Sequence, residues 1–238
     1  MITTKEAAGI LGVTPIRIRQ LIKEGRLPAE KIGRDYLIDV EGVERFSEND
    51  RPARRPTNDE RLASQITLLE EYVARKRKWL KDRPMEIQQL KENVGKEIGS
   101  DPRVFQALLE DMPQVFMADG DLPEPTFGEQ ATHAALTLFA LHGDDGAASE
   151  TISKAVTRLL MTSKDASFKE SIFKQWKAML EATDYLTFEQ SASKLIKLFA
   201  KNDINIKWPR FASDVFLLFQ EGTRFTKLYT WQDDVMWH

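Results

Sequence analysis

The sequence predicts a mainly α-helical protein with a small N-terminal domain and a larger, all-helical body. Three observations support this fold class. Apolar residues recur at intervals of three and four through most of the chain, which is the period of amphipathic helices. Strand signals are confined to one short segment at 31–38. A polar segment at 47–60, SENDRPARRPTNDE, contains two prolines and no large apolar residue, so it cannot bury itself and separates the two parts.

The charge of the chain changes sign along its length. Residues 1–79 contain 16 Lys and Arg against 13 Asp and Glu, whereas residues 80–238 contain 18 against 24. Together with the polar segment, this asymmetry predicts a small basic domain at 1–48, a linker at 49–60 and a larger acidic domain at 61–238.

Composition excludes several kinds of chemistry. With 238 residues, 42% of them hydrophobic, the chain can bury one large core or two small ones. It contains no cysteine, which excludes disulfides, thiolate nucleophiles and cysteine-ligated zinc. No apolar stretch approaches the roughly 20 residues that cross a bilayer, and the N-terminus lacks an apolar signal region. We therefore expect a cytoplasmic protein that does not bind membranes.

Residues typical of helix starts and ends predict two helices in the first part of the N-terminal domain. Thr3 and Glu6 have the spacing of a capping box, which predicts a first helix that ends at Gly12. Thr14 and Pro15 are typical of an N-cap and first helical position, so a second helix follows after a tight turn. Its expected buried stripe comprises Ile18, Leu21 and Ile22. The other faces then carry Ile16, Arg17, Arg19, Gln20 and Lys23.

The segment KIGRDYLI at 31–38 predicts two short strands that turn at Gly33 and Arg34. The segment DVEGVERF at 39–46 predicts a last helix that packs through Val40, Val43 and Phe46. Helix, turn, helix, hairpin and helix form a winged helix-turn-helix. Through TTKEAAGILGV, IRQLIKEGRLP and KIGRDYLI, residues 2–46 resemble the excisionase and MerR-type DNA-binding domains.

This resemblance implies that the second helix enters the DNA major groove and that the hairpin reaches the backbone or the minor groove. The implied DNA-binding residues are Thr14, Arg17, Arg19, Lys23, Lys31 and Arg34. Arginine and lysine neutralise phosphates, arginine can bind guanine bidentately, and Ile16 could meet a thymine methyl. The alternatives are a solvated basic face or a domain that docks on protein.

The body begins with a helix predicted from Arg61 onward, and further helix starts are predicted at Asp101 and at 187–190. The first helix ends in the basic run 75–78. Two interpretations fit this run: a solvated helix end near the negative helix pole, or a phosphate contact.

Three later helical segments, 150–161, 168–180 and 192–201, have an apolar stripe on one side. Their opposite positions carry Lys154, Arg158, Lys174, Lys177, Lys194, Lys197 and Lys201. A basic track on an acidic body is typical of a nucleic-acid groove. Solvated lysines on amphipathic helices are the alternative, because that arrangement is common.

The body contains, in this order, the segments LKENVGK, HAALTLFALHG, SFKESIFKQWKAML, LIKLFAKNDINIKWPRFASDV and YTWQDDVMW. Through this series the body resembles the CasB family, the small subunit of the type I-E CRISPR Cascade complex. The resemblance implies an all-helical body of two packed bundles without catalytic activity. It also implies two copies per complex, which contact the backbone subunits holding the guide RNA and stabilise the target and displaced DNA strands of the R-loop.

The resemblance also assigns basic positions. The pair before the family's Gly-Lys falls on Lys91 and Glu92, and that Lys falls on Lys96. Arg158 and Lys174 occupy basic places before the Leu-Leu pair and before the tryptophan. Glu92 puts an anion where a cation is expected, which weakens the case for strong intrinsic DNA affinity.

No enzyme site emerges. His133 and His142 lie nine residues apart, half a helical turn out of phase and about 13 Å apart along the axis, so HAALTLFALHG is predicted to be a core helix and not a metal site. HGDDG at 142–146 is interpreted as a loop. We therefore predict no catalytic residue, no metal and no cofactor.

Two functions follow from the sequence. The first is a Cascade small subunit in RNA-guided antiviral defence, with an added module that contacts duplex DNA. The second is a stand-alone transcriptional regulator or recombination accessory factor whose helical part dimerises. A regulator has no reason to repeat the CasB series, which favours the first.

Overall fold

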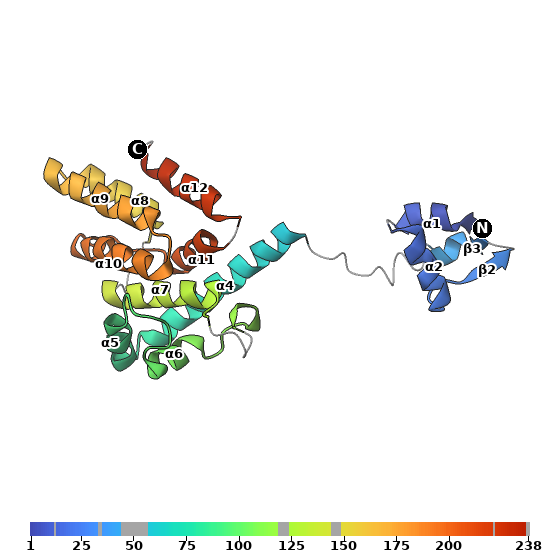
Figure 1. Cartoon of the computed structure of the whole chain (residues 1–238), viewed down its shortest axis with the longest axis horizontal. Helices are drawn as coiled ribbons and strands as arrows, with labels where there is room; N and C mark the ends of the chain where they lie inside the picture. The colour runs from blue at the N-terminus through green and yellow to red at the C-terminus, as the bar shows by residue number, and fades with distance from the viewer. Residues whose placement is uncertain are drawn as a thin grey trace. The chain divides into compact units, whose positions relative to one another are not determined.

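The computed structural model describes residues 1–11, 13–32, 35–43, 57–118, 124–143, 149–220 and 222–236. Residue contacts divide the chain into two compact units, Met1–Asp59 and Glu60–His238. Figure 1 shows helices in both units and the small sheet in the first.

The N-terminal unit combines a small sheet with helices. Its elements are β1 (Ile2–Thr3), α1 (Thr4–Leu11), α2 (Pro15–Lys23), β2 (Ala29–Ile32) and β3 (Asp35–Ile38), and residues 40–43 are also helical. The antiparallel sheet has the order β1-β3-β2. The predicted two helices and hairpin are therefore confirmed, whereas β1 was not predicted because a two-residue strand has no alternation to detect. Gly33, Arg34 and Phe46 lie outside the described residues.

The predicted caps hold both helices. The Thr3 amide donates to Glu6 Oε2 at 2.8 Å, and the Glu6 amide donates to Thr3 Oγ1 at 3.3 Å, which is the expected capping box. Thr14 Oγ1 accepts from the Arg17 amide at 3.3 Å. The core contains Ala7, Ala8, Leu11, Ile18, Leu21, Leu27, Ile38 and Val43. The buried stripe predicted for α2 thus faces this core, with Ile22 partly buried beside it.

The second unit is an all-helical body. Its elements are α4 (Asn58–Leu80), α5 (Pro84–Glu92), α6 (Pro102–Leu109), the short 3₁₀ helix η1 (Gln114–Phe116), α7 (Phe127–His142), α8 (Ile152–Thr162), α9 (Ala166–Glu181), α10 (Tyr185–Lys201), α11 (Trp208–Phe219) and α12 (Arg224–Met236). Helix α7 packs against α5, α6, α10 and α11. In Figure 1, α5 and α6 lie on one side of α7, and α10 and α11 on the other. This confirms the predicted body of two packed bundles.

Helix α7 is the central core helix that the sequence predicts. Thr126 and Glu129 form a capping box at its start, and Gly143 ends it with φ +76°, a conformation that favours glycine. Its two histidines face different neighbours. The His133 ring contacts the Tyr185 hydroxyl, whereas His142 Nε2 lies 2.9 Å from the Ile204 carbonyl oxygen. The two rings therefore do not form one site.

Two helices of the body begin at residues other than those predicted. Helix α4 begins at Asn58, three residues before Arg61. Helix α10 begins at Tyr185 because the Asp184 carboxylate accepts from the Thr187 amide at 2.9 Å, which places Thr187 in the first turn. The start predicted at Asp101 is confirmed, since its carboxylate accepts from the Arg103 amide at 3.0 Å.

Part of the basic run at 75–78 docks α4 on α6. Lys76 is only 6% exposed, and its Nζ donates to the Ala107 carbonyl at 2.9 Å. Burial lowers the pKa of Lys76. Arg75 donates to the Asp111 carbonyl at 3.4 Å, and the Tyr72 hydroxyl contacts two further carbonyls. These side chains satisfy carbonyls at the end of α6. For Lys76, both the solvated helix end and the phosphate contact are therefore wrong.

Candidate nucleic-acid interfaces

The outer face of α2 carries basic and hydrogen-bonding side chains. Arg19, Gln20 and Lys23 are exposed, while Ile18 and Leu21 on the opposite side are buried. Ile16, near the start of the helix, is 75% exposed, the placement that an apolar contact with a base would need. The exposed face therefore has the composition expected of a DNA-reading helix.

Arg17 differs from the other cations of α2. Its guanidinium lies 3.6 Å from the Glu24 carboxylate, and both side chains are about one-third exposed. No ion pair is formed by Arg19 or Lys23 within the described residues. Because surface ion pairs contribute little stability, this contact leaves Arg17 able to bind another anion.

The hairpin is described in part. Lys31 lies on β2, paired with Tyr36 across the ladder, and its side chain is exposed. Arg34 lies outside the described residues, so its DNA contact stays a prediction.

The body presents a stripe of lysines on α10. Lys194, Lys197 and Lys201 are all exposed, and their spacing of three and four places them on one face. The opposite face of the helix buries Leu195, Ile196 and Phe199. These three lysines form no ion pair within the described ranges. Their seven-residue span corresponds to about 10 Å along the helix.

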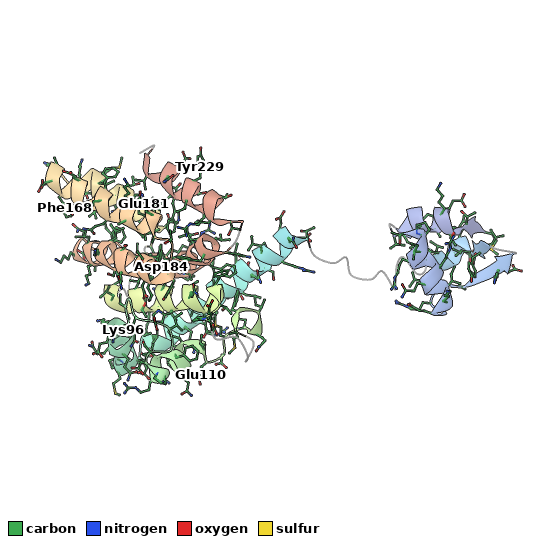
Figure 2. The ribbon with its side chains drawn as sticks, viewed as in Figure 1. Lys96, Glu110, Phe168, Glu181, Asp184 and Tyr229 are labelled. Atoms are coloured by element: carbon green, nitrogen blue, oxygen red, sulfur yellow. The ribbon has the colours of Figure 1, made fainter. Side chains whose placement is uncertain are left out.

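Lys96 extends this stripe beyond α10. It follows Gly95, whose carbonyl accepts from Gln190 Nε2 at 3.4 Å, and Gln190 lies one helical turn before Lys194. Gly95 has φ +71°, and a Cβ there would lie 2.8 Å from Gln190 Cγ, so the approach requires glycine. Lys96, labelled in Figure 2, is exposed. We call Lys96, Lys194, Lys197 and Lys201 the α10 track.

The other predicted cations lie in different surroundings. Lys91 is half-buried on the last turn of α5. Lys154 and Arg158 share the exposed stripe of α8, and Arg158 lies 3.3 Å from Glu150. On α9, Lys177 lies 3.6 Å from Glu181. Lys174 is exposed on the same helix.

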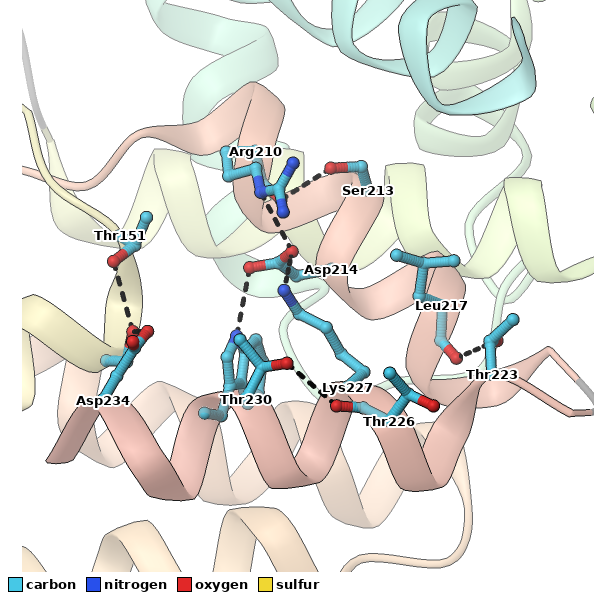
Figure 3. A network of polar contacts seen from close by, with 12 residues as sticks. Thr151, Arg210, Ser213, Asp214, Leu217, Thr223, Thr226, Lys227, Thr230 and Asp234 are labelled. Atoms are coloured by element: carbon cyan, nitrogen blue, oxygen red, sulfur yellow. Dashed lines mark hydrogen bonds and ion pairs between the residues drawn. The ribbon is translucent and has the colours of Figure 1, made fainter. Parts of the chain in front are cut away.

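A polar network centred on the buried Asp214 joins α11 and α12 (Figure 3). The Asp214 carboxylate contacts Lys227, lies 3.2 Å from Arg210 Nε, and accepts a hydrogen bond from Trp231 Nε1 at 3.1 Å. Burial raises the pKa of Asp214 despite these cations. Glu70 of α4 also lies 3.7 Å from Arg210. Lys227 is therefore engaged in packing, and the sequence pattern did not reveal this network.

The described part of the chain contains neither a metal-binding cluster nor a helix that could span a membrane. No group of three or more His, Asp or Glu side chains there could hold a metal ion. None of its helices is both long enough and apolar enough to span a bilayer. Of the segment HGDDG, residues 144–146 lie outside the described residues, so its interpretation as a loop stays a prediction.

Comparisons with known proteins agree with both units. A family model described as CRISPR-associated protein Cse2 matches residues 86–234, and a helix-turn-helix domain model matches residues 1–51. The crystal structure of CasB from Thermobifida fusca is similar to the chain with a TM-score of 0.54 and 18% identity, covering 71% of this chain and 96% of that one. The two proteins therefore share a fold. A search of curated proteins gave no match.

Proposed function

The chain belongs to the CRISPR-associated protein Cse2 family, and we propose that it serves as a non-catalytic small subunit of a type I-E Cascade complex. The observation that carries this proposal is the family match over most of the helical body, and the shared fold with a CasB protein agrees with it. A stand-alone regulator would not need such a body.

In this role the body bridges backbone subunits and stabilises the target and displaced strands of the R-loop. The α10 track supports this proposal, because four exposed lysines without ion pairs in the described ranges can neutralise successive phosphates. Guide RNA, target DNA, the other subunits and a second copy of the chain are its proposed partners. The acidic character of the body makes its isolated affinity weak, and assembly raises the effective concentration of DNA at the track.

Lys91, Lys154 and Arg158 are secondary candidates for contacts with the same strands. Their case is weaker because Lys91 is half-buried and Arg158 already faces Glu150. We do not include Lys174 and Lys177 in the track, because both line a groove that also contains two glutamates.

The N-terminal unit contacts duplex DNA beside the R-loop. Its proposed contacts are Thr14, Arg17, Arg19, Lys23, Lys31 and Arg34. The exposed face of α2 and the match to a helix-turn-helix model support this assignment. A single small domain makes few contacts, so its binding is expected to be weak and sensitive to salt unless the complex tethers it.

Removing residues 1–50 is expected to leave incorporation into Cascade unchanged and to weaken the binding of target DNA. The loss should be at least about tenfold near 0.1 M salt, because several phosphate contacts disappear together. Titrating the affinity of the purified complex for target DNA against salt measures both the loss and the reduced salt dependence.

A charge variant separates DNA contact from protein docking. The change Arg19→Glu with Lys23→Glu leaves the core of the domain untouched and should reproduce most of the loss. If the deletion leaves the affinity unchanged at every salt concentration, the domain docks on protein and our assignment fails.

A further inference from the structure

A groove of about 640 Å³ lies between α9 and α12. Its floor is apolar and is formed by Trp176, Leu180 and Val235, all of them buried. Phe173 stands at its opening and is 50% exposed. The Trp176 ring packs against Trp231 at 5.7 Å, which fixes the floor. An exposed aromatic side chain beside a rigid apolar floor is typical of a protein-binding hot spot.

The charges around the groove do not favour nucleic acid. Along α9 they follow the order Glu170, Lys174, Lys177 and Glu181. The two anions offset the two cations, and Lys177 lies only 3.6 Å from Glu181. A polyanion would therefore gain no net attraction here, in contrast with the α10 track.

The walls of the groove offer a bound peptide only side-chain contacts and no free backbone hydrogen-bond partners. Both of its walls are helices, whose backbone groups are bonded within each helix. An extended peptide on the apolar floor would leave its own N–H and C=O groups without partners, whereas a helix satisfies them internally. The lining part of α9, from Glu170 to Glu181, is about 16 Å long, which corresponds to three helical turns.

We infer that this groove binds an amphipathic α-helix of another polypeptide. The apolar stripe of that helix covers Phe173 and the floor. Acidic residues at its centre face Lys174 and Lys177, and basic residues near its ends face Glu170 and Glu181. Such charge complementarity fixes the register of the docked helix, while the aromatic contact supplies most of the affinity.

Two synthetic helical peptides test this inference. Both carry leucine at i, i+3, i+4 and i+7; one has an acidic centre with basic ends, and the other has these charges inverted. Fluorescence anisotropy with the full-length chain should show that the acidic-centre peptide binds about tenfold more tightly. The change Lys174→Glu with Lys177→Glu should reverse this preference, whereas Lys154→Glu, on α8 outside the groove, should not.

The aromatic contact is tested separately. Phe173→Ala should lower the affinity for the acidic-centre peptide at least about tenfold without changing the melting temperature, because the ring is half exposed. Met161→Ala is the matched control, since Met161 is 64% exposed on α8 and does not line the groove. Absence of binding by either peptide, equal binding of both, or displacement of the peptide by a single-stranded oligonucleotide would overturn the inference.

Discussion

Replacing Lys194, Lys197 and Lys201 together by alanine is expected to lower the affinity of the full-length chain for single-stranded DNA by about 100-fold near 0.1 M salt. Each phosphate contact on a single strand contributes a salt slope of roughly 0.7, and its effect vanishes near 1 M salt. Three contacts therefore account for about two orders of magnitude. The slope of log K against log salt should fall by about 2, as measured by fluorescence anisotropy between roughly 0.05 and 0.2 M salt.

A second triple variant distinguishes the effect of the position of the lysines from the effect of the net charge of the chain. Lys81, Lys164 and Lys207 are exposed, lie outside the α10 track, and lose the same charge when changed to alanine. This control should keep most of the affinity and its salt slope. If both triple variants lose affinity equally, the attraction comes from the overall charge and not from the α10 track.

Replacing His133 by leucine is expected to lower the free energy of unfolding by about 3–5 kcal/mol. The His133 ring lies between α7 and α10, where Nδ1 is 3.5 Å from Glu189 Oε2 and contacts the Tyr185 hydroxyl. Glu189 is fully buried, and its Oε2 accepts no hydrogen bond from the described residues. Without the ring, Glu189 Oε2 loses this neighbour while the carboxylate stays buried, and the contact of Oε1 with the Thr137 hydroxyl is unaffected. Burial and the negative charge of Glu189 also raise the pKa of Tyr185.

Chemical denaturation of three variants resolves the origin of this loss. Adding Glu189→Met to His133→Leu removes the stranded carboxylate and should recover at least half of the lost stability. His142→Leu is the control at the other end of α7, where one hydrogen bond to the Ile204 carbonyl is lost, and it should cost about 0.5–1.5 kcal/mol. A double variant as unstable as the single one would show that cavity formation, and not the buried charge, causes the loss.

The features predicted well from the sequence are those with local signals. Thr14 followed by Pro15 fixes the start of α2 through one side-chain hydrogen bond and one preset φ angle, and both act within three residues. The apolar run of α7 predicts burial on nearly all sides, since its period leaves no polar face. The exposure of Arg19 and Lys194 follows from the same helical periodicity.

The features that were missed depend on contacts between distant parts of the chain. Lys96 was predicted as a basic position, but its placement beside the lysines of α10 was not, because it depends on the packing of Gly95 against Gln190, 95 residues later. Lys76 is buried because it reaches a carbonyl of α6, although the run around it is typical of a solvated helix end. Asp214 and Lys227 meet across two helices. Periodicity gives the face of a helix, but the partner of that face depends on tertiary packing.

Co-expression of the tagged full-length chain with the other Cascade subunits and a guide RNA tests the proposed role most directly. Native mass spectrometry of the purified material gives the composition and copy number of the complex. We expect the chain to co-purify in the small-subunit position, with two copies per complex. The account fails if the chain is absent from an otherwise complete complex and instead binds a single palindromic duplex tightly on its own.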